Sequence, residues 1–273
     1  MADAWILLNE YADYPPAEAL TKARAAALKA LELAPDLADA HASLAMCKFC
    51  QDWDWDGADA EFQRAINLNP SYTTAHHWHA NLLSAVGRLD DARSELERAI
   101  QIDGLSPITR TALGWRVYAS GRQYDKAMRE IQAAIELEPH FEFAHRRLGT
   151  ILLLAGRHEE GLAEMRRGVS AENPSAMALS DLGHACAVAG RTEEARKILD
   201  HLLRLSSSQY VEATRIALVY LGLGEKNQAI SWLEKARERR DVGLLVVRAD
   251  PRFETLRGEP RYRELLRAMR FAE

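Results

Sequence analysis

The chain is poor in the residues and patterns that mark secreted, disulfide-stapled or membrane-spanning proteins. Its 273 residues include only 3 Cys, 9 Pro and 15 Gly. Three cysteines are too few for a disulfide framework, which fits a reducing compartment. The uninterrupted apolar runs, such as Ile151 to Ala155, are far shorter than the roughly 18 residues that a membrane helix needs. The first residues lack a basic segment followed by an apolar core, so no signal peptide is expected. We therefore expect a cytoplasmic protein that does not enter a membrane.

The sequence also lacks the local motifs of the common enzyme classes. It contains no nucleophile elbow, no glycine-rich loop that could cradle phosphates and no metalloprotease motif. Acidic and basic residues are abundant, but on helical surfaces such side chains are usually solvated. We therefore predict that the chain is not an enzyme and needs no cofactor.

The formal charge is unevenly distributed along the chain. The whole chain carries -5, whereas the segment from Lys235 to Arg270 contains 11 Lys and Arg against 6 Asp and Glu, a local balance of +5. Acids and bases are interleaved in this segment. That pattern favours a solvated helical surface over a nucleic-acid-binding patch, so no direct contact with nucleic acid is expected.

Small residues recur along the chain at a spacing of 34 or 35 residues. They are Ala23, Ala58, Ala92, Ala127, Gly161, Ala195 and Ala229. Four positions after them stand Ala27, Phe62, Leu96, Ile131, Met165, Leu199 and Leu233, and seven positions after them stand Ala30, Ala65, Ala99, Ala134, Gly168, Leu202 and Ala236. A spacing of four and then three residues marks one face of a helix. The sequence thus predicts about seven equivalent helices.

The first six of these helices are expected to end at a helix-breaking residue or segment. The breakers are Pro35, Pro70, Gly104, Pro139, Pro174 and the run Ser206-Ser207-Ser208. Proline cannot continue a helix and disfavours helical geometry in the residue before it. A second helix-sized segment follows most breakers and ends near a glycine, at Gly87, Gly121, Gly156, Gly190 or Gly224. The repeating unit is therefore a helix-turn-helix hairpin.

These columns resemble tetratricopeptide repeats. The resemblance includes the period, the small-apolar-small column and the pairs Leu113-Gly114, Leu148-Gly149 and Leu182-Gly183. It implies an all-α fold, a right-handed superhelical solenoid of helical hairpins. Residues 1–240 would form about seven hairpins and residues 241–273 a C-terminal capping segment. It also implies a non-enzymatic interaction module that binds a protein or peptide partner in a concave groove.

Three segments resemble, more narrowly, the C-terminal repeat domain of bacterial signalling proteins that contain winged-helix regulators, nucleotide cyclases or protein kinases. They are Asp52-Trp53-Asp54-Trp55, Ala75-His76-His77-Trp78, and Asp250-Pro251-Arg252-Phe253 with Arg257-Gly258-Glu259-Pro260-Arg261-Tyr262 after it. This likeness implies an alternative function, a regulatory or sensory domain. A homodimer is left open.

The last segment has the pattern of an amphipathic capping helix. Pro260 suits the first turn of a helix. Helical spacing then places Tyr262, Leu265, Leu266 and Met269 on one face, with Arg261, Arg263, Glu264 and Arg267 towards water. The apolar face would cover the last hairpin.

Three clusters could hold metal or perform redox chemistry, and each has a structural interpretation that we favour. Asp52 to Gly57 imitates half of a calcium loop, but the twelfth position is Gln63 instead of glutamate. We expect Asp54 or Asp52 to cap a helix while Trp53 and Trp55 pack between hairpins.

The remaining two clusters are a cysteine pair and a histidine group. Cys47 and Cys50 lie late in a helix without a second pair, which favours buried apolar thiols. His76 and His79 share a helical face, and a metal-dependent enzyme built on them is the weakest alternative. We favour imidazoles satisfied in the core, because His41 and His145 occupy the position of His76 in other repeats. No metal site is predicted.

The groove-facing residues follow from the face opposite the inward-packing positions of each first helix. We expect this face to be exposed and to carry the partner-binding residues Phe49, His77, Asn81, Trp115, Tyr118, Phe143, Arg146 and His184. The aromatic side chains would bury apolar partner surface, and the histidine, amide and arginine side chains would fix polar or acidic groups.

Overall fold

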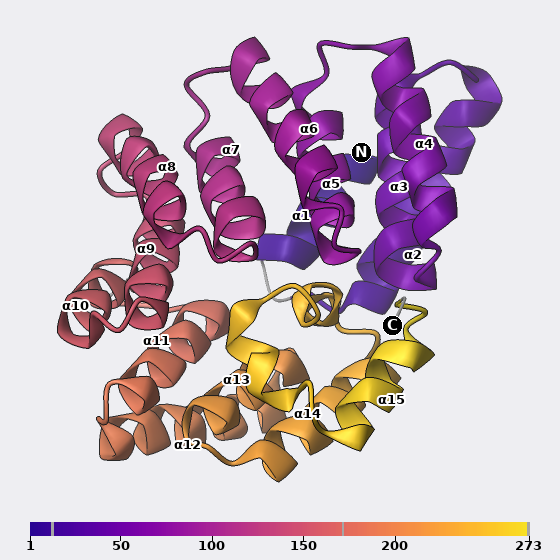
Figure 1. The fold of residues 1–273 in the computed structure, drawn as a ribbon. Coiled ribbons are helices and arrows are strands. Elements are labelled where there is room, and N and C mark those ends of the chain that lie inside the picture. Colours follow the sequence, from indigo (N-terminus) through magenta and orange to yellow (C-terminus); the bar gives the residue numbers. More distant parts are fainter. Residues whose placement is uncertain (12–13, 171, 272–273) are drawn as a thin grey trace. The chain divides into compact units, whose positions relative to one another are not determined.

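The chain folds into successive helical hairpins. The computed structural model describes residues 1–11, 14–170 and 172–271, and every regular element in these ranges is helical (Figure 1). The predicted all-α class is confirmed. Each first helix packs against the second helix of its own hairpin, because neither helix can bury its apolar stripe alone.

Within these ranges seven hairpins precede the C-terminal segment, as the repeat spacing predicts. They are α1 (Ala2–Tyr11) with α2 (Pro16–Leu33), α3 (Ala38–Cys47) and η1 (Lys48–Asp52) with α4 (Trp55–Leu68), α5 (Thr73–Ala85) with α6 (Leu89–Ile102), α7 (Pro107–Ala112) and η2 (Leu113–Ala119) with α8 (Tyr124–Leu137), α9 (Glu142–Leu154) with α10 (His158–Arg167), α11 (Ala176–Val188) with α12 (Thr192–Ser208), and α13 (Ala213–Gly222) with α14 (Lys226–Arg239). The turns η1 and η2 are π-helical continuations of α3 and α7. The C-terminal segment contains the 3₁₀ turns η3 (Val242–Val246) and η4 (Pro251–Leu256) and the helix α15 (Pro260–Ala268).

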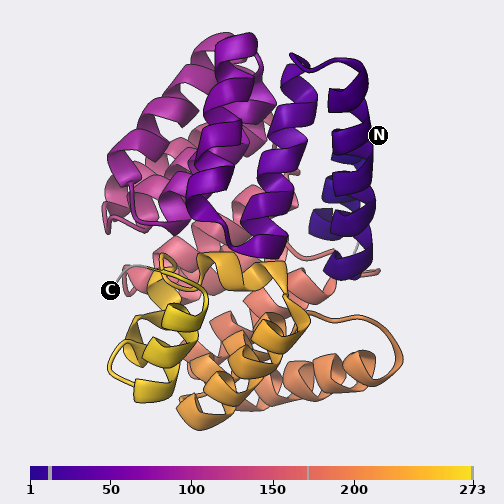
Figure 2. The same ribbon diagram turned by 90° about the vertical axis from the view of Figure 1, so that its right-hand side faces the viewer.

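The chain divides into two compact units. The N-terminal unit comprises Met1–Leu105 and Arg267–Glu273, and the C-terminal unit comprises Ser106–Leu266. The N-terminal unit contains α1 to α6, whose paired helices are seen along their length in Figure 2. The C-terminal unit contains α7 to α14, both 3₁₀ turns and most of α15.

The helix ends follow the predicted breakers with three differences. The second helix of the fifth hairpin ends at Arg167, before Gly168 and well before Pro174. The serine run does not stop α12, which continues to Ser208 while the three hydroxyls donate to carbonyls three residues earlier. In the fourth hairpin the left-handed turn residue is Arg122, with φ 59°, instead of Gly121. At the other four turns the predicted glycines do have positive φ.

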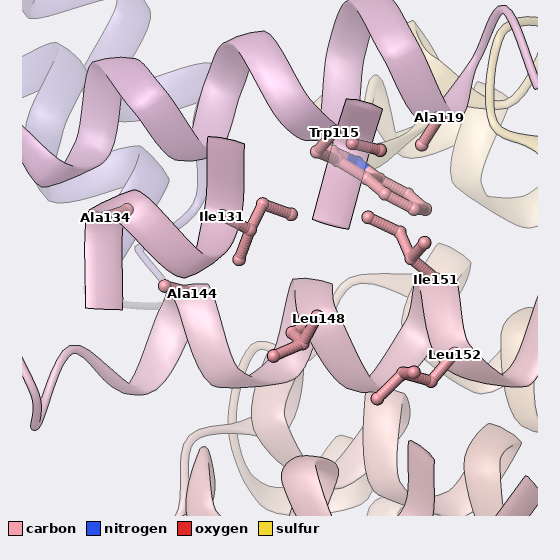
Figure 3. Packing of buried hydrophobic residues seen from close by; sticks show 9 residues of the cluster. Trp115, Ala119, Ile131, Ala134, Ala144, Leu148, Ile151 and Leu152 are labelled. Carbon is pink, nitrogen blue, oxygen red and sulfur yellow. The ribbon is translucent and has the colours of Figure 1, made fainter. Parts of the chain in front are cut away.

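The small-residue column forms the contact between the two helices of each hairpin. All seven members are buried, and the six alanines are fully so. The following apolar column fills the space beside them, as around Ile131, Ala134 and Trp115 in Figure 3. Gly149 of α9 and Gly161 of α10 meet backbone to backbone, because a Cβ on Gly149 would lie 2.7 Å from the carbonyl oxygen of Gly161.

Gly149→Ala is therefore expected to lower the free energy of unfolding by about 1–3 kcal/mol, since α9 and α10 must separate to admit the methyl group. Urea unfolding measures the loss. Gly258→Ala is the matched control, because no heavy atom lies within 4 Å of its would-be Cβ and the effect should stay within about 0.5 kcal/mol. Equal effects at the two positions would contradict the close approach.

The C-terminal helix has the predicted amphipathic pattern. Tyr262, Leu265 and Met269 are buried, while the four predicted water-facing residues are exposed. The Tyr262 hydroxyl donates to the Val247 carbonyl oxygen over 2.8 Å, and Arg261 pairs with Glu234 of α14 at 2.6 Å. The C-terminal helix is thus attached both to the segment before it and to the last hairpin.

Candidate partner-binding site

The predicted groove residues fall in both units of the chain. Phe49, His77 and Asn81 belong to the N-terminal unit, and the other five to the C-terminal unit. The expectation that all eight are exposed is wrong: Phe49, Asn81, Trp115, Arg146 and His184 are 4–7% exposed. His77, Tyr118 and Phe143 are half-buried.

In the N-terminal unit, Phe49 packs in an aromatic cluster. Its ring meets Trp55 edge to face, with 5.8 Å between centroids, and Trp55 stacks on Phe271 at 4.9 Å. The Trp55 indole N–H donates to the Arg270 carbonyl oxygen over 3.0 Å. Phe49 therefore packs against the tryptophan that holds Arg270 and Phe271 within this unit.

In the C-terminal unit, three of the five predicted residues, Trp115, Phe143 and Arg146, lie in a cluster around one buried carboxylate. Asp181, on α11, is 1% exposed. Its Oδ2 accepts a hydrogen bond from Arg147 Nη2 over 2.8 Å and lies 3.4 Å from Arg146 Nε. Its Oδ1 accepts from Arg252 Nη1 over 2.8 Å. One carboxylate thus holds guanidinium groups from α9 and from η4.

Aromatic rings line the same cluster. The Arg147 guanidinium carbon lies 4.9 Å from the ring centroids of both Trp115 and Phe143. Arg252 lies 5.3 Å from the Trp115 centroid, and Arg146 lies 5.8 Å from the Phe143 centroid. Cations near aromatic faces within about 6 Å are attracted by the ring quadrupole. The site is an arginine-aromatic cluster, which we call the Asp181 cluster: Trp115, Phe143, Arg146, Arg147, Asp181 and Arg252.

Burial and charge set the ionisation of the cluster. Burial opposes ionisation of Asp181, yet the charges of Arg147, Arg252 and Arg146 hold its pKa well below the usual range. Burial lowers the pKa of Arg147 to about 9. Burial, aided by Arg252, lowers the pKa of His184 to about 4, so this histidine is neutral at pH 7 and does not add a positive charge.

The segment that delivers Arg252 is itself fixed. Asp250 caps η4 by accepting from the Arg252 backbone N–H over 2.9 Å, and its carboxylate pairs with the Arg252 guanidinium at 2.6 Å. Phe253, in the same turn, is buried. Arg122 of the fourth hairpin also pairs with Glu254. The C-terminal segment thus lies against the first helices of the array, in addition to capping its last hairpin.

Sequence reasoning missed Arg147, Asp181 and Arg252 as members of the site. Arg252 lay in a segment singled out for its resemblance, and Arg147 directly follows the predicted Arg146. Asp181 carried no local signal. Phe49, Trp115 and Tyr118 lie in η1 and η2, where the wider π-helical turn changes the face to which each residue belongs.

The histidine positions form the predicted structural ladder. In three hairpins the Nδ1 atom of the histidine lies 2.5–2.7 Å from a glutamate of the second helix, and its Nε2 atom lies 2.9–3.2 Å from a proline carbonyl oxygen. The histidines are His41, His76 and His145. Each imidazole thereby joins its hairpin to the preceding turn, which confirms the interpretation as satisfied core side chains.

The His76–Glu95 pair predicts a pH dependence of stability. The hydrogen bond to Glu95 raises the pKa of His76 above its ordinary 6.5, against burial and the charge of Arg98. Although burial opposes it, hydrogen bonds from His76 and His79 lower the pKa of Glu95 from 4.5 to about 2. The contribution of His76 to the free energy of unfolding is complete below pH 6.5, and it is lost as the pH rises through the raised pKa of His76. The glutamate contribution is present above pH 4.5 and is lost as the pH falls towards 2.

Glu95→Gln is accordingly expected to cost the most stability between about pH 4.5 and 6.5, by about 1–3 kcal/mol, because it leaves a buried imidazole without its anionic partner. Urea unfolding across pH 4–9 measures this difference, and NMR titration reports the His76 pKa directly. Glu97→Gln, at an exposed position of the same helix, is the control. A loss that does not shrink at alkaline pH would contradict the ion pair.

The other two clusters also have the structural roles that we favoured. Asp54 caps α4 by accepting from the Gly57 N–H over 3.1 Å, and Trp53 is buried. Cys47 and Cys50 are buried, and burial raises the pKa of Cys47 to about 11. Within the residues that the structure describes, no group of three or more His, Cys, Asp or Glu is placed to hold a metal ion. Nor does any helix in the described part of the chain have the length and apolarity to cross a membrane.

The hairpins and their shared contacts define an α-helical repeat protein. Family models described as tetratricopeptide repeat match residues 111–176, residues 73–98 and 176–201, and residues 214–240. The chain therefore contains tetratricopeptide repeats, as the sequence columns predict. A comparison with curated proteins found no match.

Solved structures resemble this chain in fold. The APC/C hetero-tetramer Cut9-Hcn1 gives a TM-score of 0.58 at 19% identity, over 89% of this chain, and this chain spans only 44% of that one. TTC0263, a thermophilic TPR protein of Thermus thermophilus, gives 0.58 at 17% identity, over 72% of this chain and 99% of that one. PilW, a type IV pilus biogenesis factor, gives a TM-score of 0.56 at 16% identity, over 80% of this chain and 97% of that one. These likenesses confirm the predicted fold class, an all-helical tetratricopeptide-repeat solenoid.

Proposed function

We propose that this chain is a non-enzymatic protein-interaction module whose Asp181 cluster binds a peptide segment of a partner protein. Tetratricopeptide-repeat proteins are in general interaction modules for proteins or peptides. The first helices of three consecutive hairpins supply Trp115, Phe143 with Arg146 and Arg147, and Asp181. Aromatic and arginine side chains gathered in this way are typical of energetically important interface positions.

One observation carries the proposal: this surface already holds a peptide segment, the chain's own residues 250–256. That segment forms a short 3₁₀ turn, inserts Arg252 beside Trp115 and Asp181, and buries Phe253. A surface that holds one short segment through a charged side chain has the chemistry to hold another. Tyr118 and His184 extend the proposed site in the C-terminal unit, and Phe49, His77 and Asn81 remain the proposed contacts of the N-terminal unit.

The proposal is tested with a peptide library displayed on phage and selected against the full chain. We expect enriched peptides whose affinity falls about tenfold, a cost of about 1.4 kcal/mol, in Phe143→Ala. Phe143 is half-buried whereas Trp115 is buried, so the Phe143 ring can be removed with less disturbance of the fold. Tyr124→Ala is the control, a half-buried aromatic on the second helix α8. Binding that is insensitive to Phe143, or equally sensitive to Tyr124, would contradict the proposed surface.

A regulatory role is the second candidate, and the same segment favours it. Because residues 250–256 cover part of the Asp181 cluster, a partner gains access only when the segment moves, and binding then depends on the state of the C-terminal segment. Such a domain would control an attached or separate signalling effector. Light scattering of the isolated chain, with and without a selected peptide, tests whether occupation of the site changes the oligomeric state.

A further inference from the structure

Arg252 occupies an environment suited specifically to an arginine side chain. Its side chain is 6% exposed, and its guanidinium lies between Asp181 at 2.8 Å and Asp250 at 2.6 Å. The Trp115 ring lies 5.3 Å away. A planar cation that donates to carboxylates on two sides and lies near an indole uses properties that lysine lacks.

Most of this environment belongs to the repeat array and not to the segment that carries Arg252. Trp115 comes from η2, Arg147 from α9 and Asp181 from α11, and only Asp250 travels with Arg252. The two oxygens of Asp181 have different partners: Oδ2 accepts from Arg147, and Oδ1 accepts from Arg252. The array therefore provides one oriented carboxylate oxygen and one indole ring for an incoming guanidinium.

We propose that the Asp181 cluster is a recognition site for an arginine on the partner segment, and that Arg252 is its internal occupant. The partner segment would carry a carboxylate two residues before the arginine and an aromatic residue after it, as Asp250 and Phe253 flank Arg252. This inference rests on the proposed function and specifies the chemistry of the partner.

The chain contains a second copy of the same pattern, which shows that the pattern alone does not bury an arginine. Nine residues after Asp250-Pro251-Arg252-Phe253 stands Glu259-Pro260-Arg261-Tyr262. Arg261 pairs with Glu234 on the surface, with 47% of its side chain exposed. What encloses Arg252 is thus the array surface around Asp181 and not the local sequence.

The internal occupant leaves part of the cluster unsatisfied. Arg147 Nε is buried and has no hydrogen-bond acceptor among the described residues, and Arg146 Nε, also buried, meets Asp181 Oδ2 only in the ion pair at 3.4 Å. Buried donors without an acceptor cost stability. A partner segment with one additional carboxylate could accept from these donors, which gives an external arginine segment a means of competing with the tethered one.

The probe is a fluorescein-labelled peptide with the sequence of residues 248–258, added to the full chain and followed by fluorescence anisotropy. The tethered segment has an effective concentration in the millimolar range, so the unmodified chain should bind the probe weakly. Arg252→Ala in the full chain removes the competing guanidinium and should tighten binding about tenfold or more. Arg257→Ala, at an exposed arginine one residue after the same turn, is the matched control and should leave binding unchanged.

Specificity for arginine is measured on the Arg252→Ala chain. A probe that itself carries Arg252→Ala should bind about tenfold more weakly than the parent probe, and a probe that carries Arg257→Ala should bind like the parent. Adding Asp181→Asn to the chain should weaken the parent probe and not the alanine probe. Circular dichroism checks the fold of each variant, and Arg252→Lys serves where Arg252→Ala does not fold.

Equal binding of the parent and alanine probes, or no binding to any folded Arg252 variant, would overturn the proposal. Peptides selected from the phage library keep the two proposals distinguishable. If such peptides bind in a Phe143-dependent manner without needing an arginine, the interaction site stands and the arginine specificity fails. If their affinity depends on one arginine and on Asp181, both are supported.

Discussion

Asp181→Ala is expected to lower the free energy of unfolding by about 3–5 kcal/mol, because it removes the partner of buried guanidinium groups and leaves them in an apolar environment. Arg147 loses its hydrogen bond to the Asp181 carboxylate, and Arg252 keeps its pairing with Asp250. The measurement is urea unfolding followed by tryptophan emission and by circular dichroism, with coincident transitions as the condition for a single free energy.

Two further variants separate the charge effect from other causes. Asp200→Ala replaces an exposed aspartate of α12 and should change stability by no more than about 0.5 kcal/mol. Asp181→Asn keeps an acceptor for one arginine, so its loss of stability should lie between those of Asp181→Ala and Asp200→Ala. High salt should leave the Asp181→Ala loss almost unchanged, because buried pairs are poorly screened. A loss below about 1 kcal/mol would mean that the cluster is not a buried ion network.

The parts of the fold that sequence predicts well are those set by local chemistry. The column from Ala23 to Ala229 gives the hairpin contacts, because helical periodicity alone decides which residues share a face. Turn glycines such as Gly87 mark left-handed positions that other residues enter at a cost. The capping helix from Pro260 to Ala268 is amphipathic in the predicted register for the same reason.

The site was harder to predict because its contacts are not local. Arg252 and Asp181 are 71 residues apart, and nothing in the spacing of either residue selects this pair from the many arginines and acids of the chain. Trp115 was correctly expected on the first helix of its hairpin, but its burial depends on a π-helical stretch and on Arg147 and Arg252 beside it. Such departures from regular helix are frequent at functional sites.

The histidine ladder lies between these two cases. The recurrence of His41, His76 and His145 at one repeat position predicted a structural role. The partners that make this role work, a proline carbonyl six residues before and a glutamate on the second helix, recur with the same period. Repetition thus allowed a structural role to be inferred where a single instance would not, although the partners themselves were found only in the structure.

Phe62→Ala is expected to be as costly as Asp181→Ala, at about 3–5 kcal/mol, because it empties the largest position of the apolar column. Phe62 is fully buried in α4, and its ring stacks on His79 of α5 with 5.5 Å between centroids. The equivalent positions carry smaller side chains, such as Ala27 and Leu96.

The loss should be local, since each repeat is stabilised by its nearest neighbours. Hydrogen exchange is therefore expected to accelerate most in α4 and α5, together with a lower urea midpoint. Leu68→Ala, on the same helix but 37% exposed, is the matched control and should cost no more than about 1 kcal/mol. If the two variants lost equal stability, the column would not be the contact that joins α4 to α5. A loss confined to Phe62→Ala would instead show that the apolar column contributes the packing energy between α4 and α5.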